Sequence, residues 1–168
     1  MLDLANAYAW IADLVGDIGE YQVAHRYRKR QIKIFEDLLI DDPQNRKIQY
    51  RWTTSAIALG YVSVELDLLE EASSLHAEAI QKSRSLELTD DSNTDWLASE
   101  YLLAILNAYI KCSEKLYYEC KSLARNIRED ISRSPDNLKP GFASFHVFKR
   151  LKRLEEMIAK LENSEKAK

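Results

Sequence analysis

A segment of 48 residues that recurs three times is the feature that most constrains how this chain can fold. Small side chains recur at this interval at Ala24, Ala72 and Cys120. A second small set keeps the same interval, as does a bulky set: Ala12, Gly60 and Ala108, and Tyr21, Leu69 and Tyr117. Small residues let two helices approach closely, so each repeat predicts a pair of packed helices. Stacked helical pairs of this kind are typical of solenoids.

The composition also favours helices. Hydrophobic residues make up 46% of the 168 residues and charged residues 30%, as in folded chains. Four Gly and three Pro are too few for the many turns of an all-β fold. We therefore expect an all-α fold, with three antiparallel helical hairpins in a right-handed solenoid and a C-terminal capping helix.

Turn signals place the boundaries of these hairpins. Asp3 can cap the first helix, Asp42 can cap the third, and Pro43 suits a first helical position. Polar breaks over 89–93 and 134–137 end the second and third hairpins. Within 1–134, the hairpins are expected at about 3–42, 43–92 and 93–134. The remainder, 135–168, is expected to hold a loop, the capping helix over about 142–162 and a frayed tail.

Several motifs resemble the tetratricopeptide repeat family. They are the Leu59-Gly60 pair, the Gly19-x-Tyr21-x-x-Ala24 turn and the 12-residue spacing from Gly60 to Ala72. The resemblance covers about residues 4 to 134. It departs from the family at the aromatic position after the Ala, which is occupied by Arg28, His76 and Ala124. The period of 48 exceeds the usual value of about 34, so the resemblance implies a divergent member with longer helices.

No pattern of residues indicates an enzyme. His25, His76 and His146 are isolated, and none has a Glu three residues before it, so the ligand spacing of a metal site in a helical bundle is missing. Paired acids such as Glu70-Glu71 point in different directions on a helix and are interpreted as solvated. We expect no catalytic residues, no cofactor and no metal.

The cysteines and the N-terminus bear on localisation. Cys112 and Cys120 lack CxxC spacing, so we expect no disulfide framework and a reducing compartment. The N-terminus does not resemble a signal peptide, and no apolar run is long enough for a membrane span. These features predict a cytoplasmic protein without a membrane partner.

Basic residues cluster in the second helix, where Arg26, Lys29, Arg30 and Lys33 share one face, and again over 149–153. Such a face could bind an acidic partner or a nucleic-acid backbone, or it could be an ordinary solvated surface. The net charge of −3 and the scarcity of interleaved aromatic residues favour the solvated surface. Nucleic acid is therefore disfavoured as a partner.

The resemblance implies that the first helix of each hairpin lines a concave binding face. The 48-residue interval makes Asp13, Tyr61 and Tyr109 equivalent, and likewise Asp17 and Glu65. The predicted partner-binding residues are Asn6, Trp10, Asp13, Asp17, Tyr61, Glu65 and Tyr109. This acidic and aromatic set suits a basic or apolar peptide segment. In the alternative interpretation, some of these aromatic residues belong to the core.

The two ends of the chain carry further apolar faces. The first helix is apolar nearly all round, so we expect it to pack against a second copy, forming a homodimer, or against an upstream domain. Apolar residues in the last helix alternate at spacings of four and three, which fits either a capping helix or a coiled-coil seam: Val147, Leu151, Leu154, Ile158 and Leu161.

Taken together, these patterns predict a non-enzymatic protein–protein interaction module, a scaffold of helical repeats. The alternative is a regulatory or sensor fragment of a larger signalling protein whose effector domain lies outside this chain.

Overall fold

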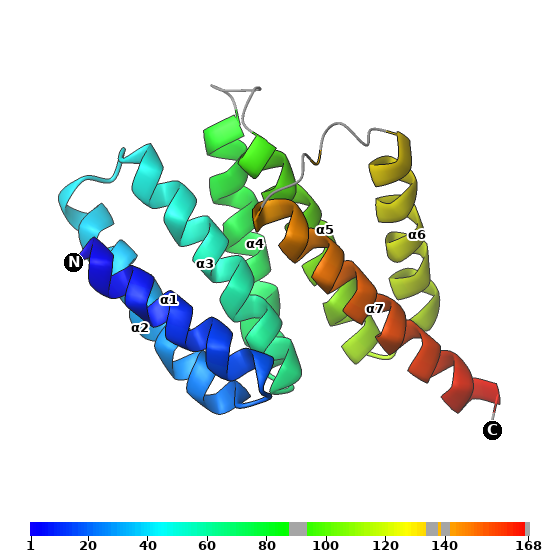
Figure 1. The fold of residues 1–168 in the computed structure, drawn as a ribbon. Coiled ribbons are helices and arrows are strands. Elements are labelled where there is room, and N and C mark those ends of the chain that lie inside the picture. Colours follow the sequence, from blue (N-terminus) through cyan, green and yellow to red (C-terminus); the bar gives the residue numbers. More distant parts are fainter. Residues whose placement is uncertain (88–93, 134–137, 139–141, 167–168) are drawn as a thin grey trace. The chain divides into compact units, whose positions relative to one another are not determined.

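The computed structural model describes residues 1–87, 94–133, 138 and 142–166, and within these ranges all regular structure is α-helical (Figure 1). This confirms the expected all-α class. The helices are α1 (Leu2–Asp17), α2 (Tyr21–Asp41), α3 (Arg46–Glu65), α4 (Leu69–Glu87), α5 (Thr94–Ser113), α6 (Tyr117–Arg133) and α7 (Phe142–Lys166). In the described residues, none of these helices combines the length and apolar character that crossing a membrane requires.

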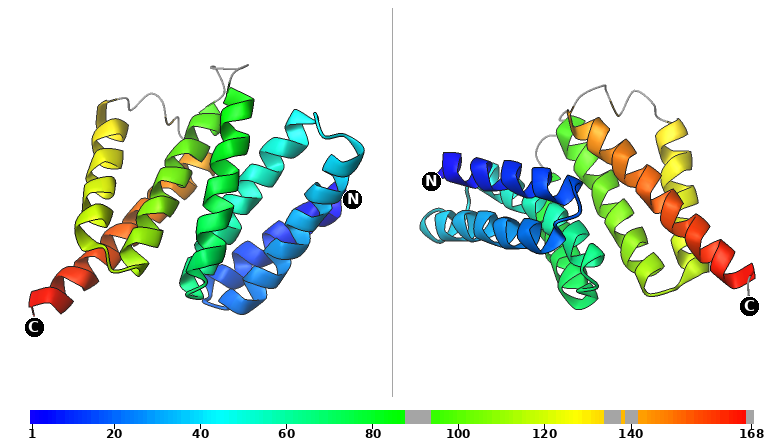
Figure 2. Two further views of the ribbon diagram at one scale, coloured as in Figure 1. Left: turned by 180° about the vertical axis from the view of Figure 1, so that it is seen from behind. Right: turned by 60° about the horizontal axis from the view of Figure 1, so that its bottom comes forward.

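The chain divides into two compact units, Met1–Thr89 and Asp90–Lys168. In the first unit, α1 packs on α2, α2 on α3, and α3 on α4. In the second unit, α5 packs on both α6 and α7, and α6 also contacts α7 (Figure 2). The hydroxyl of Tyr109 in α5 donates a hydrogen bond of 3.0 Å to the carbonyl of Arg150 in α7. The last helix therefore covers part of α5, as a capping helix would.

The three turns that follow α1, α3 and α5 have the same backbone structure, 48 residues apart. Gly19, Asp67 and Lys115 occupy the left-handed region, with φ values of 87°, 60° and 61°. In each turn, the next amide donates to a carbonyl five residues back, at 2.8–2.9 Å. This is the Schellman motif, in which a residue in the left-handed region ends one helix and turns the chain toward the next. The residues that follow these turns, Tyr21, Leu69 and Tyr117, are the first residues of α2, α4 and α6.

The small residues of the repeat are buried, as the sequence predicts. Ala24, Ala72 and Cys120 are 0% exposed. The second small set is equally enclosed: Ala12, Gly60 and Ala108. Ala12 of α1, Ala24 of α2 and Val62 of α3 form one cluster, so this cluster lies where three helices meet. A larger side chain at these positions would separate the helices.

Cys112 and Cys120 form a disulfide, although no disulfide framework was expected from the sequence. Their Cα atoms lie 5.2 Å apart across the turn between α5 and α6. The equivalent pair in the first repeat is Gly16 and Ala24, where a Cβ at Gly16 would lie 3.7 Å from that of Ala24. The turn therefore brings these two positions together in both repeats. Because these cysteines are paired, they no longer indicate a reducing compartment.

Three predicted helix ends were wrong. Asn45, and not Asp42 or Pro43, caps α3, because its side-chain oxygen accepts from the Ile48 amide at 3.2 Å. Asp42 instead ends α2, and its carboxylate accepts from the Asn45 side chain. Asp3 lies within α1, whose N-cap is Met1. At the other end, α7 continues to Lys166, through residues that were expected to fray. The predicted breaks at 89–93 and 134–137 lie outside the described residues.

Replacing Lys115 by Gly is expected to raise the free energy of unfolding by about 1 kcal/mol, because a side chain in the left-handed region is strained and Gly is not. Replacing Gly19 by Ala in the equivalent turn should lower it by a similar amount. Urea denaturation of both variants measures the two effects. A loss of stability in Lys115→Gly would show that the side chain of Lys115 makes contacts that outweigh this strain.

Candidate functional site

The structure separates the predicted partner-binding residues into a buried pair, one half-buried residue and an exposed set of four. Tyr61 and Tyr109 are buried, with 2% and 0% exposure, so they belong to the core and cannot line an open groove. This corrects their assignment and supports the alternative interpretation of the aromatic residues. Glu65, at the end of α3, is half-buried. The other four residues lie on α1 and are exposed: Asn6, Trp10, Asp13 and Asp17.

The outward side of α1 is strongly apolar. Trp10 is 79% exposed, Leu14 68%, and Ile18, just after the helix, 72%. Leu4 and Ile11 are also exposed, and both lie at seven-residue intervals from Ile18, on one side of the helix. We call this surface the α1 face and define it as Leu4, Ala7, Trp10, Ile11, Leu14 and Ile18. The opposite side of α1 packs inward through Ala5 and Ala12, so this helix is apolar on both sides.

Acidic residues border the α1 face on one side. Asp3 and Asp17 lie seven residues before and after Trp10, so all three share one edge of the helix. Asp13 lies further round and pairs with Arg28 of α2. No basic residue occurs between Leu2 and Ile18. The candidate site is therefore an apolar strip with a carboxylate edge, which suits a partner that is apolar and basic.

Arg28 of α2, at the position where the tetratricopeptide family has an aromatic residue, lies beside the polar edge of α1. Its side chain is 8% exposed and donates to Gln31 Oε1 at 2.7 Å, in addition to its pair with Asp13. A buried guanidinium needs such partners to offset the loss of hydration. Arg51 of α3 donates to Asn6 Oδ1 at 3.3 Å. These contacts attach the polar edge of α1 to α2 and α3, and so orient the α1 face outward.

The carboxylate of Glu71 joins three helices, although the sequence indicated a solvated side chain. His25 Nε2 of α2 lies 2.6 Å from Glu71 Oε2, and Lys29 of the same helix donates to Oε1 at 2.9 Å. Ser63 of α3 donates to Oε2 at 2.8 Å. Burial by itself raises the pKa of Glu71, but the hydrogen bonds from His25, Lys29 and Ser63 outweigh it and lower the pKa to about 2. Lys29, one of the basic residues predicted to share a face of α2, thus pairs with a carboxylate of the same chain.

The hydrogen bonds of this cluster lie within the first unit, where they join α2, α3 and α4. Ser63 is buried and its hydroxyl donates to Glu71, whose lowered pKa makes this carboxylate a weak base. Among the residues that the structure describes, no group of three or more His, Cys, Asp or Glu side chains is placed to hold a metal ion.

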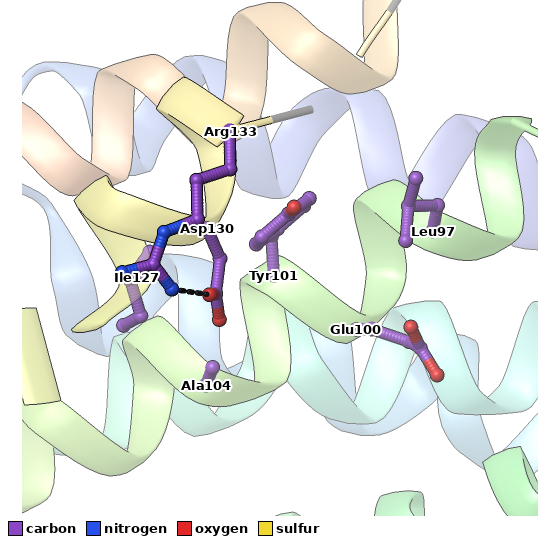
Figure 3. A pocket seen from close by; sticks show the side chains of 7 residues that line it. All are labelled: Leu97, Glu100, Tyr101, Ala104, Ile127, Asp130 and Arg133. Atoms are coloured by element: carbon purple, nitrogen blue, oxygen red, sulfur yellow. Dashed lines mark ion pairs between the residues drawn. The ribbon is translucent and has the colours of Figure 1, made fainter. Parts of the chain in front are cut away.

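A second candidate lies in the other unit, as a pocket of about 420 Å³ between α5 and α6. Figure 3 shows Glu100 and Tyr101 of α5 with Asp130 and Arg133 of α6, and Arg133 pairs with Asp130 at 3.9 Å. Burial, followed by the charges of Asp130 and Glu100, raises the pKa of Tyr101. Leu97, Ala104 and Ile127 supply the apolar part of the lining. The pocket therefore combines two carboxylates, one of them paired with Arg133, with an apolar wall.

Comparison with protein-family models, with curated proteins and with solved structures finds no match for this chain.

Proposed function

We propose that this chain is a non-enzymatic protein-interaction module that binds a partner through the α1 face. The observation that carries the proposal is the exposure of Trp10, Leu14 and Ile18 on one side of a single helix. A soluble protein rarely exposes a contiguous apolar surface of this kind unless something covers it. Tryptophan is also the residue type that contributes most at protein interfaces.

The repeats support the same class of function. Three turns with one hydrogen-bond pattern, and small residues buried at a 48-residue interval, are features of chains built from stacked helical pairs. Such arrays, including the tetratricopeptide repeats that the motifs resemble, present extended surfaces to other proteins. We propose that the three helical pairs form a right-handed array and that α7 closes its C-terminal end.

The edge of the α1 face sets the chemistry of the partner. Asp3 and Asp17 flank Trp10 on this edge, while Asp13 pairs with Arg28 of α2. An amphipathic helix with an apolar side and flanking lysines or arginines matches this surface in both shape and charge. The predicted preference for a basic or apolar segment is kept, but the binding surface moves from a concave groove to the outward side of α1.

Binding of paired synthetic peptides tests this proposal. We expect an amphipathic helical peptide with lysines along its apolar side to bind, and its glutamate counterpart to bind at least about tenfold more weakly. Salt should weaken the lysine peptide's binding by screening the carboxylates. Replacing Trp10 by Ala should weaken binding at least about tenfold, as expected for a large aromatic side chain that is buried by the partner. Fluorescence anisotropy of labelled peptides measures each affinity.

A matched control is Tyr118→Ala, which removes an aromatic side chain that is 81% exposed on α6. This variant should bind the lysine peptide as the parent chain does. Equal binding of the two peptides, or an unchanged affinity in Trp10→Ala, would refute the proposal.

A further inference from the structure

The α5–α6 pair differs from the α3–α4 pair at two facing positions of the repeat. In the α3–α4 pair, Trp52 of α3 is 3% exposed, and Lys82 of α4 lies over its ring, with Nζ 4.7 Å from the ring centroid. The indole ring therefore lies against α4, shielded from solvent. At the 48-residue interval, the same two positions are occupied by Glu100 of α5 and Asp130 of α6. The α5–α6 pair thus lacks the aromatic ring and the cation that covers it.

The pocket between α5 and α6 lies at these positions. Glu100 and Asp130 both line it (Figure 3), and its volume is about 420 Å³. An apolar cavity of about 150 Å³ already holds benzene, so this space is large enough for an aromatic ring. The small residue beside it is also less enclosed than its counterpart, because Ala56 of α3 is 0% exposed whereas Ala104 of α5 is half-buried. The place that Trp52 fills in one pair is therefore open in the next.

The walls of the pocket suit a flat apolar ring. Tyr101 and Ile127 line it where the residues 48 positions earlier are a threonine and an alanine. An aromatic and an aliphatic side chain thus replace a hydroxyl and a methyl group, and aromatic ligands pack well on such surfaces. Because Asp130 pairs with Arg133, recognition is assigned to the shape of the pocket and its apolar contacts.

We infer that the α5–α6 pocket binds a small molecule through a planar aromatic ring of about the size of indole, in the place that Trp52 holds in the α3–α4 pair. This site lies in the second unit and is separate from the α1 face. A ring bound there contacts both α5 and α6, as the Trp52 side chain contacts α4 from α3. The ligand should therefore also stabilise the second unit, since it binds only the folded chain.

Titration of the parent chain with indole tests the inference, followed by NMR of its methyl groups. The methyl signals of Ala104 and Ile127 should shift in a saturable way, because both residues line the pocket. Glu100→Trp restores the residue type of the α3–α4 pair and should weaken indole binding at least about tenfold, because its own ring occupies the site. Arg125→Trp adds the same side chain at an exposed position of α6 and should bind indole as the parent does.

A second occluding variant guards against a folding defect in Glu100→Trp. Ala104→Leu narrows the pocket from the α5 side and should also weaken indole binding, and circular dichroism checks that each variant is folded. Indole binding that both folded variants leave unchanged would overturn the inference. So would shifts confined to the methyl groups of Leu14 on the α1 face, or a parent chain that shows no saturable binding. Peptide binding through Trp10 is measured separately, so the proposed function can stand or fail independently of this result.

Discussion

Replacing Glu71 by Gln is expected to lower the free energy of unfolding at neutral pH by about 2 kcal/mol, the typical value of a hydrogen bond to a charged group. The carboxylate accepts from His25, Lys29 and Ser63, and so ties α2 and α3 to α4. An amide has nearly the same shape but no charge, and its NH2 group cannot accept a hydrogen bond. Urea denaturation measures the loss.

The same variant should change the dependence of stability on acid. The pKa of Glu71 falls from 4.5 to about 2 in the folded chain. A carboxyl with a lowered folded pKa stabilises the fold fully above the unfolded value and loses this contribution as the pH falls through the folded value. The stability that Glu71 contributes should therefore decline between pH 4.5 and about 2, and Glu71→Gln should lack this part of the decline.

Glu70 supplies the matched control, because it is the neighbouring residue on α4 and is exposed. Glu70→Gln should leave both the urea midpoint and its pH dependence nearly unchanged, as is usual for solvated surface positions. If the two variants behave alike, the cluster around Glu71 does not stabilise the fold in solution.

Replacing Ala72 by Leu is expected to cost about 1–3 kcal/mol of stability, because a well-packed core cannot take extra methylene groups without shifts of side chains or backbone. Ala72 is 0% exposed and stands at the repeat position that Ala24 and Cys120 occupy in the other two pairs. Ala77→Leu, an exposed change on the same helix, gives the matched control and should have little effect. An unchanged unfolding midpoint in Ala72→Leu would contradict the alignment of the repeats.

Local interactions explain why the helices and their turns could be predicted. The small residues at a 48-residue interval identified the buried positions. In the structure, the bulky set at the same interval, Tyr21, Leu69 and Tyr117, forms the first residues of α2, α4 and α6. Two helix starts were assigned to the wrong residue: Asp3 lies inside α1, whose N-cap Met1 makes no side-chain hydrogen bond, and Asp42-Pro43 precedes Asn45 as a set of adjacent residues able to begin α3. Which of these residues caps depends on the path of the backbone, and in α3 it is Asn45.

The disulfide follows from the geometry of the repeat and has no local cysteine motif. Cys112 and Cys120 are eight residues apart on the two sides of a Schellman turn, as are Gly16 and Ala24. Their proximity therefore follows from the turn. The usual CxxC spacing has no bearing on it.

By itself, the sequence determined the helical class, the repeat interval and the small residues buried between helices, because these depend on contacts close along the chain. Only the tertiary structure decided which apolar faces are covered. In α1, which is apolar nearly all round, periodicity cannot distinguish the buried side of Ala5 and Ala12 from the exposed side of Trp10 and Leu14. It was likewise the tertiary structure that enclosed Tyr61 and Tyr109 and paired Glu71 with His25, because those partners come from distant parts of the chain.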